Sequence, residues 1–342
     1  MTVDLSTRYL GLPLRSPIIA SASPLTRDPE MTTRLEAAGA GAIVLPSLFE
    51  EEIENEEVEL SASLEAGTEG FAEALDYFPE VDTFIGEGDR YLRTLERIKG
   101  KAHIPIIGSL NANSVGGWVR YARLMADAGA DAIELNLYRI SVDRTRTSVD
   151  IEEEDLELIA AVRAAVNLPL AVKLSPFYTA LANFAGKAVE AGANGLVLFN
   201  RFYQPDIDLD ELAVVPRVSL SHPTELRLPM RWTAILRPQL GPEVGIAATS
   251  GIHSGKDVIK ALMVGADVVA MASALLRDGP GRIADVEAEM RAWLVENEYT
   301  SVGQLRGSAS QGKVADPGAF ERAQYIRTLH SWTSPPSLTA TA

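Results

Sequence analysis

The sequence predicts a single α/β barrel of the (β/α)8 type, and two observations support this prediction. First, a short phrase recurs four times, as AGAGAIVL, AGADAIEL, AGANGLVL and VGADVVAM, beginning at residues 38, 128, 191 and 264. In each phrase a glycine suited to the left-handed end of a helix precedes an apolar run suited to a strand buried on both faces. Second, a chain of 342 residues with 46% hydrophobic content can bury one large core.

The N-terminal part begins with two short alternating runs between Leu5 and Arg15 that are separated by Gly11. This pattern predicts a hairpin, which we expect to cover the barrel floor. The next elements are expected as a strand at residues 17–21, a helix at residues 28–38 and a strand at residues 42–46.

Two unusual segments follow the second strand. The acidic run EEEIENEEVE at residues 50–59 is typical of a solvated helix face or loop. Its carboxylates lack the alternating spacing of a calcium-binding loop, so no metal site is expected. Residues 67–89 are rich in glycine, proline, aspartate and aromatic residues, which predicts a long insertion over the barrel mouth.

Regular alternation then resumes. Further strands are expected at residues 104–110, 131–136, 168–174, 195–199, 244–249 and 267–271, which makes eight in all. Helices are expected at residues 115–128, 152–166, 181–191, 230–240, 255–264 and 280–298, with a long connection at residues 200–229. We expect residues 1–331 to form this one domain and residues 332–342 to be a disordered tail.

The composition restricts the partners and the chemistry. Thirty-one basic and 47 acidic residues give a formal charge of −16, which disfavours binding to nucleic acid or to an anionic membrane surface. The chain has no cysteine, so it can form no disulfide, no Cys-ligated iron–sulfur cluster and no thiolate nucleophile. It also shows neither a signal-peptide pattern nor a long uninterrupted apolar window. We therefore expect a cytoplasmic protein that acts on a small molecule.

Small residues follow the last two strands, in ATSGIHSGKD and MASALLRDGP. In α/β barrels, backbone N–H groups of these two loops commonly bind phosphate. Ser250, Gly251, Ala272 and Ser273 are small enough to let a phosphate approach the backbone. The alternative is that both loops are only tight turns. The occurrence of the pattern at both expected strands favours a phosphate site.

Lys173 lies near the end of the fifth strand between apolar residues. A lysine that points into a barrel has to be paired, deprotonated or bound to an anionic ligand. Glu134 on the adjacent strand is a candidate structural partner. The functional alternatives are a Schiff-base nucleophile and a cation that stabilises the electron-rich end of a cofactor. Asn136 and Asn200 end the strands on either side, and their amides fit a flat heterocycle with carbonyl and N–H edges.

In these segments the chain resembles the dihydroorotate dehydrogenase family. The resemblance includes LSTRYLGLPLRSPIIASAS near the N-terminus and AIELNL, AVKLSP, LVLFN, ATSGI and MASALL on five consecutive strands. It implies a barrel that holds FMN at the strand ends, with the phosphate at Ser250, Gly251, Ala272 and Ser273. It places the isoalloxazine ring near Ser21, Ala22, Ser47, Asn136 and Lys173. It also implies that Lys173 stabilises negative charge near flavin N1 and that Asn136 and Asn200 face the substrate.

The chain departs from the family pattern in the substrate pocket. The family's general base, a cysteine or serine in a segment similar to NLSCPN, corresponds to Arg139, which stays protonated and cannot accept a substrate proton. Pro46 stands where the family has a lysine near the substrate carboxylate, and Arg201 stands where the family has a polar residue after the strand-six asparagine. Arg139 and Arg201 are candidates for binding an anionic substrate, and Tyr138 or Ser141 for donating or relaying a proton. The alternative for either arginine is a surface salt bridge.

The expected function is an FMN-dependent oxidoreductase acting on CH–CH groups, with hydride passing between a small, anionic substrate and flavin N5. Because the pocket is altered, the substrate need not be dihydroorotate, and a role in pyrimidine biosynthesis stays open. Two alternatives also stay open: a Schiff-base lyase or aldolase that uses Lys173, and a flavin-binding electron-transfer subunit without dehydrogenase activity. Any iron–sulfur relay would belong to a protein electron acceptor, and the resemblance is compatible with a homodimer.

Overall fold

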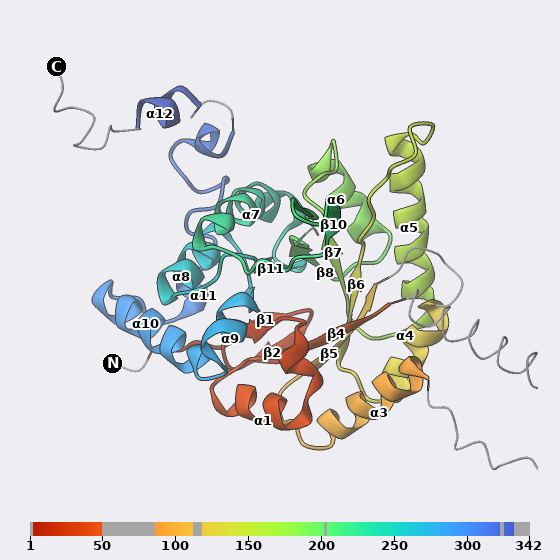
Figure 1. Ribbon diagram of the computed structural model, residues 1–342. Coiled ribbons are helices and arrows are strands. Elements are labelled where there is room, and N and C mark those ends of the chain that lie inside the picture. Colours follow the sequence, from red (N-terminus) through yellow and green to blue (C-terminus); the bar gives the residue numbers. More distant parts are fainter. Residues whose placement is uncertain (1–2, 50–85, 112–117, 202–203, 322–324, 332–342) are drawn as a thin grey trace, which may run out of the picture.

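The computed structural model describes residues 3–49, 86–111, 118–201, 204–321 and 325–331. Eight parallel strands close into a barrel inside a ring of helices, which confirms the predicted (β/α)8 fold (Figure 1). The barrel strands are, in spatial order, β3 (Ile18–Ala20), β4 (Ile43–Phe49), β5 (Ile106–Asn111), β6 (Ala132–Asn136), β7 (Leu170–Leu174), β8 (Gly195–Leu198), β11 (Gly245–Thr249) and β12 (Val268–Met271).

The helices that follow these strands are α1 (Pro29–Ala37), α3 (Glu87–Lys99), α4 (Trp118–Asp127), α5 (Ser148–Ala165), α6 (Leu181–Glu190), α7 (Arg227–Leu240), α8 (Gly255–Val264), α9 (Ser273–Asp278) and α10 (Arg282–Glu296). Short elements complete the described chain: the strands β1 (Thr7–Tyr9), β2 (Leu12–Leu14), β9 (Asp206–Asp208) and β10 (Ala213–Val215), the 3-10 helices η1 (Pro24–Arg27), η2 (Pro223–Leu226) and η3 (Pro317–Phe320), and the helices α11 (Val302–Leu305) and α12 (Tyr325–His330). In Figure 1, α12 lies outside the ring of helices. Within the described ranges, no helix combines the length and the apolar character needed to cross a membrane.

The glycine of each recurring phrase has the backbone conformation predicted for it. Gly39, Gly129, Gly192 and Gly265 follow α1, α4, α6 and α8 with φ between +93° and +119°. A residue with a Cβ is strained in this region, so glycine lets the chain leave the helix and enter the next strand within two or three residues. Each phrase therefore links a helix to a buried strand, as expected.

The hairpin β1–β2 covers the barrel floor, as predicted. Its residues Tyr9 and Leu10 are buried against the start of β8 and β11 and belong to the cluster that fills the lower barrel. A Cβ on Gly195 would lie 2.7 Å from the Leu10 side chain, and one on Gly245 would lie 3.0 Å from the Tyr9 ring. Glycine at these two strand starts therefore leaves room for the hairpin side chains Tyr9 and Leu10.

The barrel interior changes from apolar at the floor to polar at the mouth, the end where the strands point. On β6, Ala132 lies in the lower cluster, and Glu134 and Asn136 follow at two-residue intervals. On β7, Ala171 is followed in the same way by Lys173. Since alternate residues of a strand share one face, these polar side chains belong to the inward face. Apolar side chains thus fill the floor of the barrel, and polar side chains line its mouth.

Some element boundaries differ from the prediction. β4 continues past Pro46 to Phe49, with a register shift against β5 between Val44 and Ser47. The helix α3 was not predicted, because its Gly- and Asp-containing first turn resembles the preceding insertion, although Tyr91, Leu95 and Ile98 form a buried stripe.

Two further differences lie near the barrel mouth. The hairpin β9–β10 lies inside the predicted long connection, and α9 precedes α10 where one helix at residues 280–298 was expected. The Gly279–Pro280–Gly281 segment separates the two helices, since proline and glycine interrupt a helix. The acidic run, most of the 67–89 insertion and the tail at residues 332–342 lie outside the described residues.

Candidate functional site

A cavity of about 160 Å³ opens at the barrel mouth, between the ends of β3, β7, β8, β11 and β12. It is lined by nine of the residues chosen from the sequence for the cofactor or the substrate: Ser21, Ala22, Lys173, Asn200, Arg201, Ser250, Gly251, Ala272 and Ser273. We call it the cofactor cavity. Ser221, from the connection before α7, also lines it. Ser221 was not predicted, because nothing in the sequence of that connection distinguishes it from other loop serines.

Three loops meet at the end of the cofactor cavity that Ser221, Gly251 and Ser273 line. The backbone N–H of Gly251 donates to Ser221 Oγ at 3.4 Å, and the backbone N–H of Ser221 donates to Ser273 Oγ at 2.9 Å. Ser250 and Gly251 both have φ of +73°. A Cβ on Gly251 would lie 2.4 Å from the backbone nitrogen of Leu226 in η2. Glycine at position 251 is therefore needed for close packing of the loop after β11 against η2.

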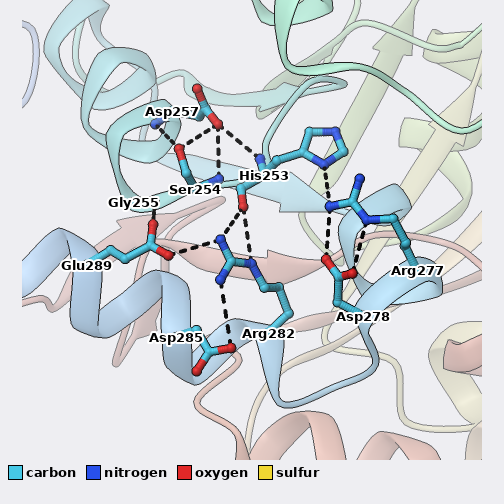
Figure 2. Close-up of polar contacts among 9 residues, drawn as sticks. All are labelled: His253, Ser254, Gly255, Asp257, Arg277, Asp278, Arg282, Asp285 and Glu289. Carbon is cyan, nitrogen blue, oxygen red and sulfur yellow. Dashed lines mark hydrogen bonds and ion pairs between the residues drawn. The ribbon is translucent and has the colours of Figure 1, made fainter.

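The loop after β11 is held in place by the start of α8 and by α10 (Figure 2). The Asp257 carboxylate accepts hydrogen bonds from the backbone N–H groups of His253 and Ser254 and from the Ser254 hydroxyl, at 2.8–3.2 Å. From α10, Arg282 Nη2 donates to the His253 carbonyl at 2.7 Å, and Glu289 accepts from the N–H of Gly255 at 2.7 Å. This network fixes the backbone between the cavity and α8.

Lys173 forms an ion pair inside the barrel. Its Nζ lies 3.2 Å from Glu134 Oε1, and both side chains are buried. The structural partner considered from the sequence is therefore present. Lys173 also lines the cofactor cavity and lies beside Asn136 in the register of β6 and β7. The pairing with Glu134 and a role toward a ligand are thus compatible.

A larger cavity of about 670 Å³ shares Asn200 and Arg201 with the first, and we call it the substrate cavity. Asn136, Tyr138 and Asn200 line it, together with Arg201 at its rim. Asn136 Oδ1 and Asn200 Nδ2 are buried, and neither has a hydrogen-bond partner in the described part of the chain. Since buried polar atoms are nearly always paired in proteins, these two atoms indicate a ligand with both a donor and an acceptor edge.

Asn111 also lines the substrate cavity, beside Asn136 in the register of β5 and β6. The sequence analysis did not select it. Its signal was the alternation of Ile107, Ser109 and Asn111 on one face of β5, which repeats the change from apolar to polar seen on β6 and β7.

The structure does not bring every predicted residue to these two cavities. Arg139 and Ser141 line a separate cavity of about 550 Å³ beside α5. There Arg139 pairs with Glu154 and lies 3.8 Å from Asp155, and the pKa of the Asp155 carboxyl is raised by burial. Glu154 and Asp155 both lie in the first half of α5, which begins after the N-cap Thr147. Arg139 is therefore engaged with α5.

Arg201 and Ser47 also have protein partners. Arg201 Nε lies 3.2 Å from Glu225 Oε2 at the rim, which is the salt bridge considered as the alternative. The Ser47 hydroxyl shares a hydrogen bond of 2.8 Å with the Ser109 hydroxyl, and Ser47 lines a small cavity against α3. No cluster of three or more metal-ligating side chains occurs among the described residues.

His253 provides a prediction for the dependence of stability on pH. Burial and the nearby Arg277 guanidinium lower the pKa of His253 below its ordinary value of 6.5. As the pH falls through about 6.5, the His253 ring takes up a proton in the unfolded chain, whereas in the folded chain it stays neutral down to a lower pH. The free energy of unfolding should therefore fall as the pH falls. We expect this loss between about pH 7.5 and 5.5 to be smaller in a His253→Gln variant, by up to about 1.4 kcal/mol per pH unit. Urea unfolding at both pH values measures it, and equal losses in the two proteins would contradict the lowered pKa.

Comparisons with known proteins identify relatives of this chain. The family model of dihydroorotate dehydrogenase matches residues 85–294, more than half of the chain. The chain is 26% identical over 321 residues to the catalytic subunit of dihydroorotate dehydrogenase B (NAD(+)) from Thermoplasma volcanium, covering 90% of this chain and 98% of the relative. The corresponding subunit from Geobacter sulfurreducens is 26% identical over 313 residues, covering 89% of this chain and 98% of the relative.

Among solved structures, the Eimeria tenella dihydroorotate dehydrogenase in complex with ferulenol superposes with a TM-score of 0.64. The alignment covers 89% of this chain and 88% of that chain at 16% identity. At this identity the likeness supports the barrel fold alone.

Proposed function

Since the chain belongs to the dihydroorotate dehydrogenase family, we propose that it is an FMN-dependent oxidoreductase that exchanges hydride between a small, anionic substrate and flavin N5. The unpaired buried amide atoms of Asn136, which lies beside Lys173 in the strand register, and of Asn200, which lines the same cavity as Lys173, support this proposal most directly. They would pair with donor and acceptor edges of flat, polar ligands, here the flavin ring and a substrate stacked on it.

The residues of the cofactor cavity fit FMN. When bound, FMN supplies a ring that takes up two electrons and an anionic phosphate. Ser250, Gly251, Ala272 and Ser273 would hold the phosphate, because their backbone and hydroxyl groups meet at one end of the cavity. Lys173 would hold its ammonium near the ring and stabilise negative charge there. Ser21 and Ala22, at the end of β3, leave space for a flat group.

The substrate cavity supports a choice among the residues proposed for proton transfer. Tyr138 lines it together with Asn136 and Asn200, whereas Arg139 and Ser141 line the cavity beside α5. A neutral phenol donates a proton at neutral pH more readily than it accepts one. We therefore assign proton donation to Tyr138, in the direction in which a C=C bond is reduced. Dihydroorotate oxidation needs the opposite transfer.

The first test is cofactor content and substrate range. The purified protein is expected to be yellow, with close to one FMN per chain, and to show negligible dihydroorotate oxidation with dye acceptors. A Tyr138→Phe variant should retain FMN and lose reduction of activated C=C substrates. Flavin absorbance, extraction of the cofactor and steady-state assays measure these results. A colourless protein that does not bind added FMN would contradict the cofactor assignment, and rapid dihydroorotate turnover would contradict the substrate assignment.

The electron-transfer alternative is supported by the Arg139 position, which offers no general base. The relatives from Thermoplasma and Geobacter are named as catalytic subunits, which supports a partner subunit that accepts the electrons. We propose a protein electron acceptor in either case, in the cytoplasm, with a homodimer as the expected state of this chain. The Schiff-base alternative is weaker, because the Lys173 amine is held in an ion pair with Glu134 and is not free to attack a carbonyl. Borohydride trapping of a substrate on Lys173 would revive it.

A further inference from the structure

Ser221 lies at the junction of the loops around the phosphate end of the cofactor cavity. It is 8% exposed and comes from the connection between β10 and η2. Its hydroxyl oxygen has two neighbours: the backbone N–H of Gly251 at 3.4 Å and Nε2 of His253 at 3.2 Å. The Gly251 N–H can only donate, so it occupies one of the two acceptor positions of the oxygen.

Arg277 determines which ring nitrogen of His253 carries the proton. Its Nη2 lies 3.5 Å from His253 Nδ1, and Figure 2 draws this contact. Arg277 is held there by Asp278, which it contacts through Nε at 3.0 Å and Nη2 at 2.9 Å. A guanidinium has only donors, so Nδ1 has to be an acceptor, and a neutral ring then carries its proton on Nε2. The Nε2–H group donates to Ser221 Oγ.

The backbone of His253 is fixed independently of its ring. Asp257 accepts from its N–H, and Arg282 donates to its carbonyl (Figure 2). The backbone that carries the ring is therefore held by α8 and α10. With Gly251 and His253 filling both acceptor positions of Ser221 Oγ, the hydroxyl proton has to point elsewhere. In the described part of the chain no acceptor receives it, and Ser221 lines the cofactor cavity.

We infer that His253 is a positioning residue that turns the Ser221 hydroxyl toward an anionic group in the cavity, the phosphate of bound FMN. The inference rests on the proposed function and adds to it a donor from the connection before α7, oriented through Arg277, His253 and Ser221. The Ser273 oxygen accepts from the Ser221 backbone N–H, so the Ser273 hydroxyl proton also points away from that contact. Two serine hydroxyls would thus donate to the phosphate from neighbouring loops.

The experiment compares four variants with the wild-type protein: Ser221→Ala, His253→Phe, His253→Gln and the double variant Ser221→Ala/His253→Phe. Glutamine keeps an N–H donor near the position of Nε2, and phenylalanine keeps only the ring. The dissociation constant for FMN is measured by flavin fluorescence on protein freed of its cofactor. The 31P NMR shift of bound FMN is measured on the loaded protein, and it reports the phosphate directly.

Ser221→Ala and His253→Phe should each weaken FMN binding by about 10- to 100-fold, the range for loss of one hydrogen bond to a charged group. The double variant should bind as Ser221→Ala does, because the histidine acts through the serine. His253→Gln should stay within about threefold of the wild type, a rescue that a purely structural role of the ring would not produce. The 31P shift should move in the two single variants and stay unchanged in His253→Gln.

Unchanged affinity and an unchanged 31P shift in Ser221→Ala would overturn the inference. Fully additive losses in the double variant would overturn the link between His253 and Ser221. If His253→Phe does not fold, Ser221→Ala and His253→Gln still decide the outcome through the 31P shift. Failure of the wild-type protein to bind FMN would instead refute the proposed function, so the two failures are distinguishable.

Discussion

Replacing Lys173 with methionine is expected to lower the free energy of unfolding by about 3–5 kcal/mol, the usual cost of removing one partner of a buried ion pair. The Glu134 carboxylate would remain inside the barrel, only 4% exposed, without the ammonium that lies 3.2 Å from it. No other cation pairs with Glu134 within the described residues. Urea unfolding of the cofactor-free protein measures the loss.

The control is the double variant Lys173→Met/Glu134→Gln, which removes both charges and nearly keeps the volume. It should recover most of the lost stability, because the cost comes from an uncompensated charge and only slightly from packing. If the double variant is as unstable as Lys173→Met, packing around the lysine is responsible. In the loaded protein, Lys173→Met should also make the midpoint potential of FMN more negative, since no cation would remain to stabilise the reduced ring. An unchanged potential would place Lys173 away from the flavin.

Replacing Gly251 with alanine is expected to weaken FMN binding by about 100-fold or more, because displacement of the loop after β11 would remove hydrogen-bond donors from the charged phosphate. The new Cβ would lie 2.4 Å from the Leu226 nitrogen and 3.0 Å from the Pro223 carbonyl oxygen. Both are backbone atoms of η2, which cannot rotate away as a side chain can. The loop therefore has to move, and the bond from the Gly251 N–H to Ser221 is lost. Flavin fluorescence titration measures the affinity.

Gly279→Ala is the matched control. Gly279 has a similar φ of +82°, but no heavy atom lies within 4 Å of the Cβ that alanine would add. This variant should lose only the about 1–3 kcal/mol of strain that a non-glycine residue meets at φ +82° and ψ 175°, and should bind FMN within about twofold of the wild type. If the two glycine variants bind FMN equally well, close packing of Gly251 on η2 does not control the cavity.

Local patterns were sufficient to predict the barrel and the position of its mouth. The four glycine phrases depend on backbone conformation and on the burial of the next few residues, and both are properties of short segments. The choice of Lys173, Asn136 and Asn200 followed from the rule that strand ends of a parallel barrel meet at one face. The helix α3 was missed because its Gly- and Asp-containing first turn resembles the preceding insertion, and α9 was missed because its six residues are too few to show a helical period.

The sequence by itself thus determined the order of the barrel elements, the small-residue loops after β11 and β12, and the arginine at the position of the family's base. Only the tertiary structure decided what each charged or polar side chain contacts. Arg139 pairs with α5, Lys173 pairs with Glu134 while lining the cofactor cavity, and Ser221 joins two loops to His253. The physical reason is that secondary structure follows from neighbours along the chain, whereas ion pairs and hydrogen bonds depend on groups that closure of the barrel brings within about 3–4 Å of each other.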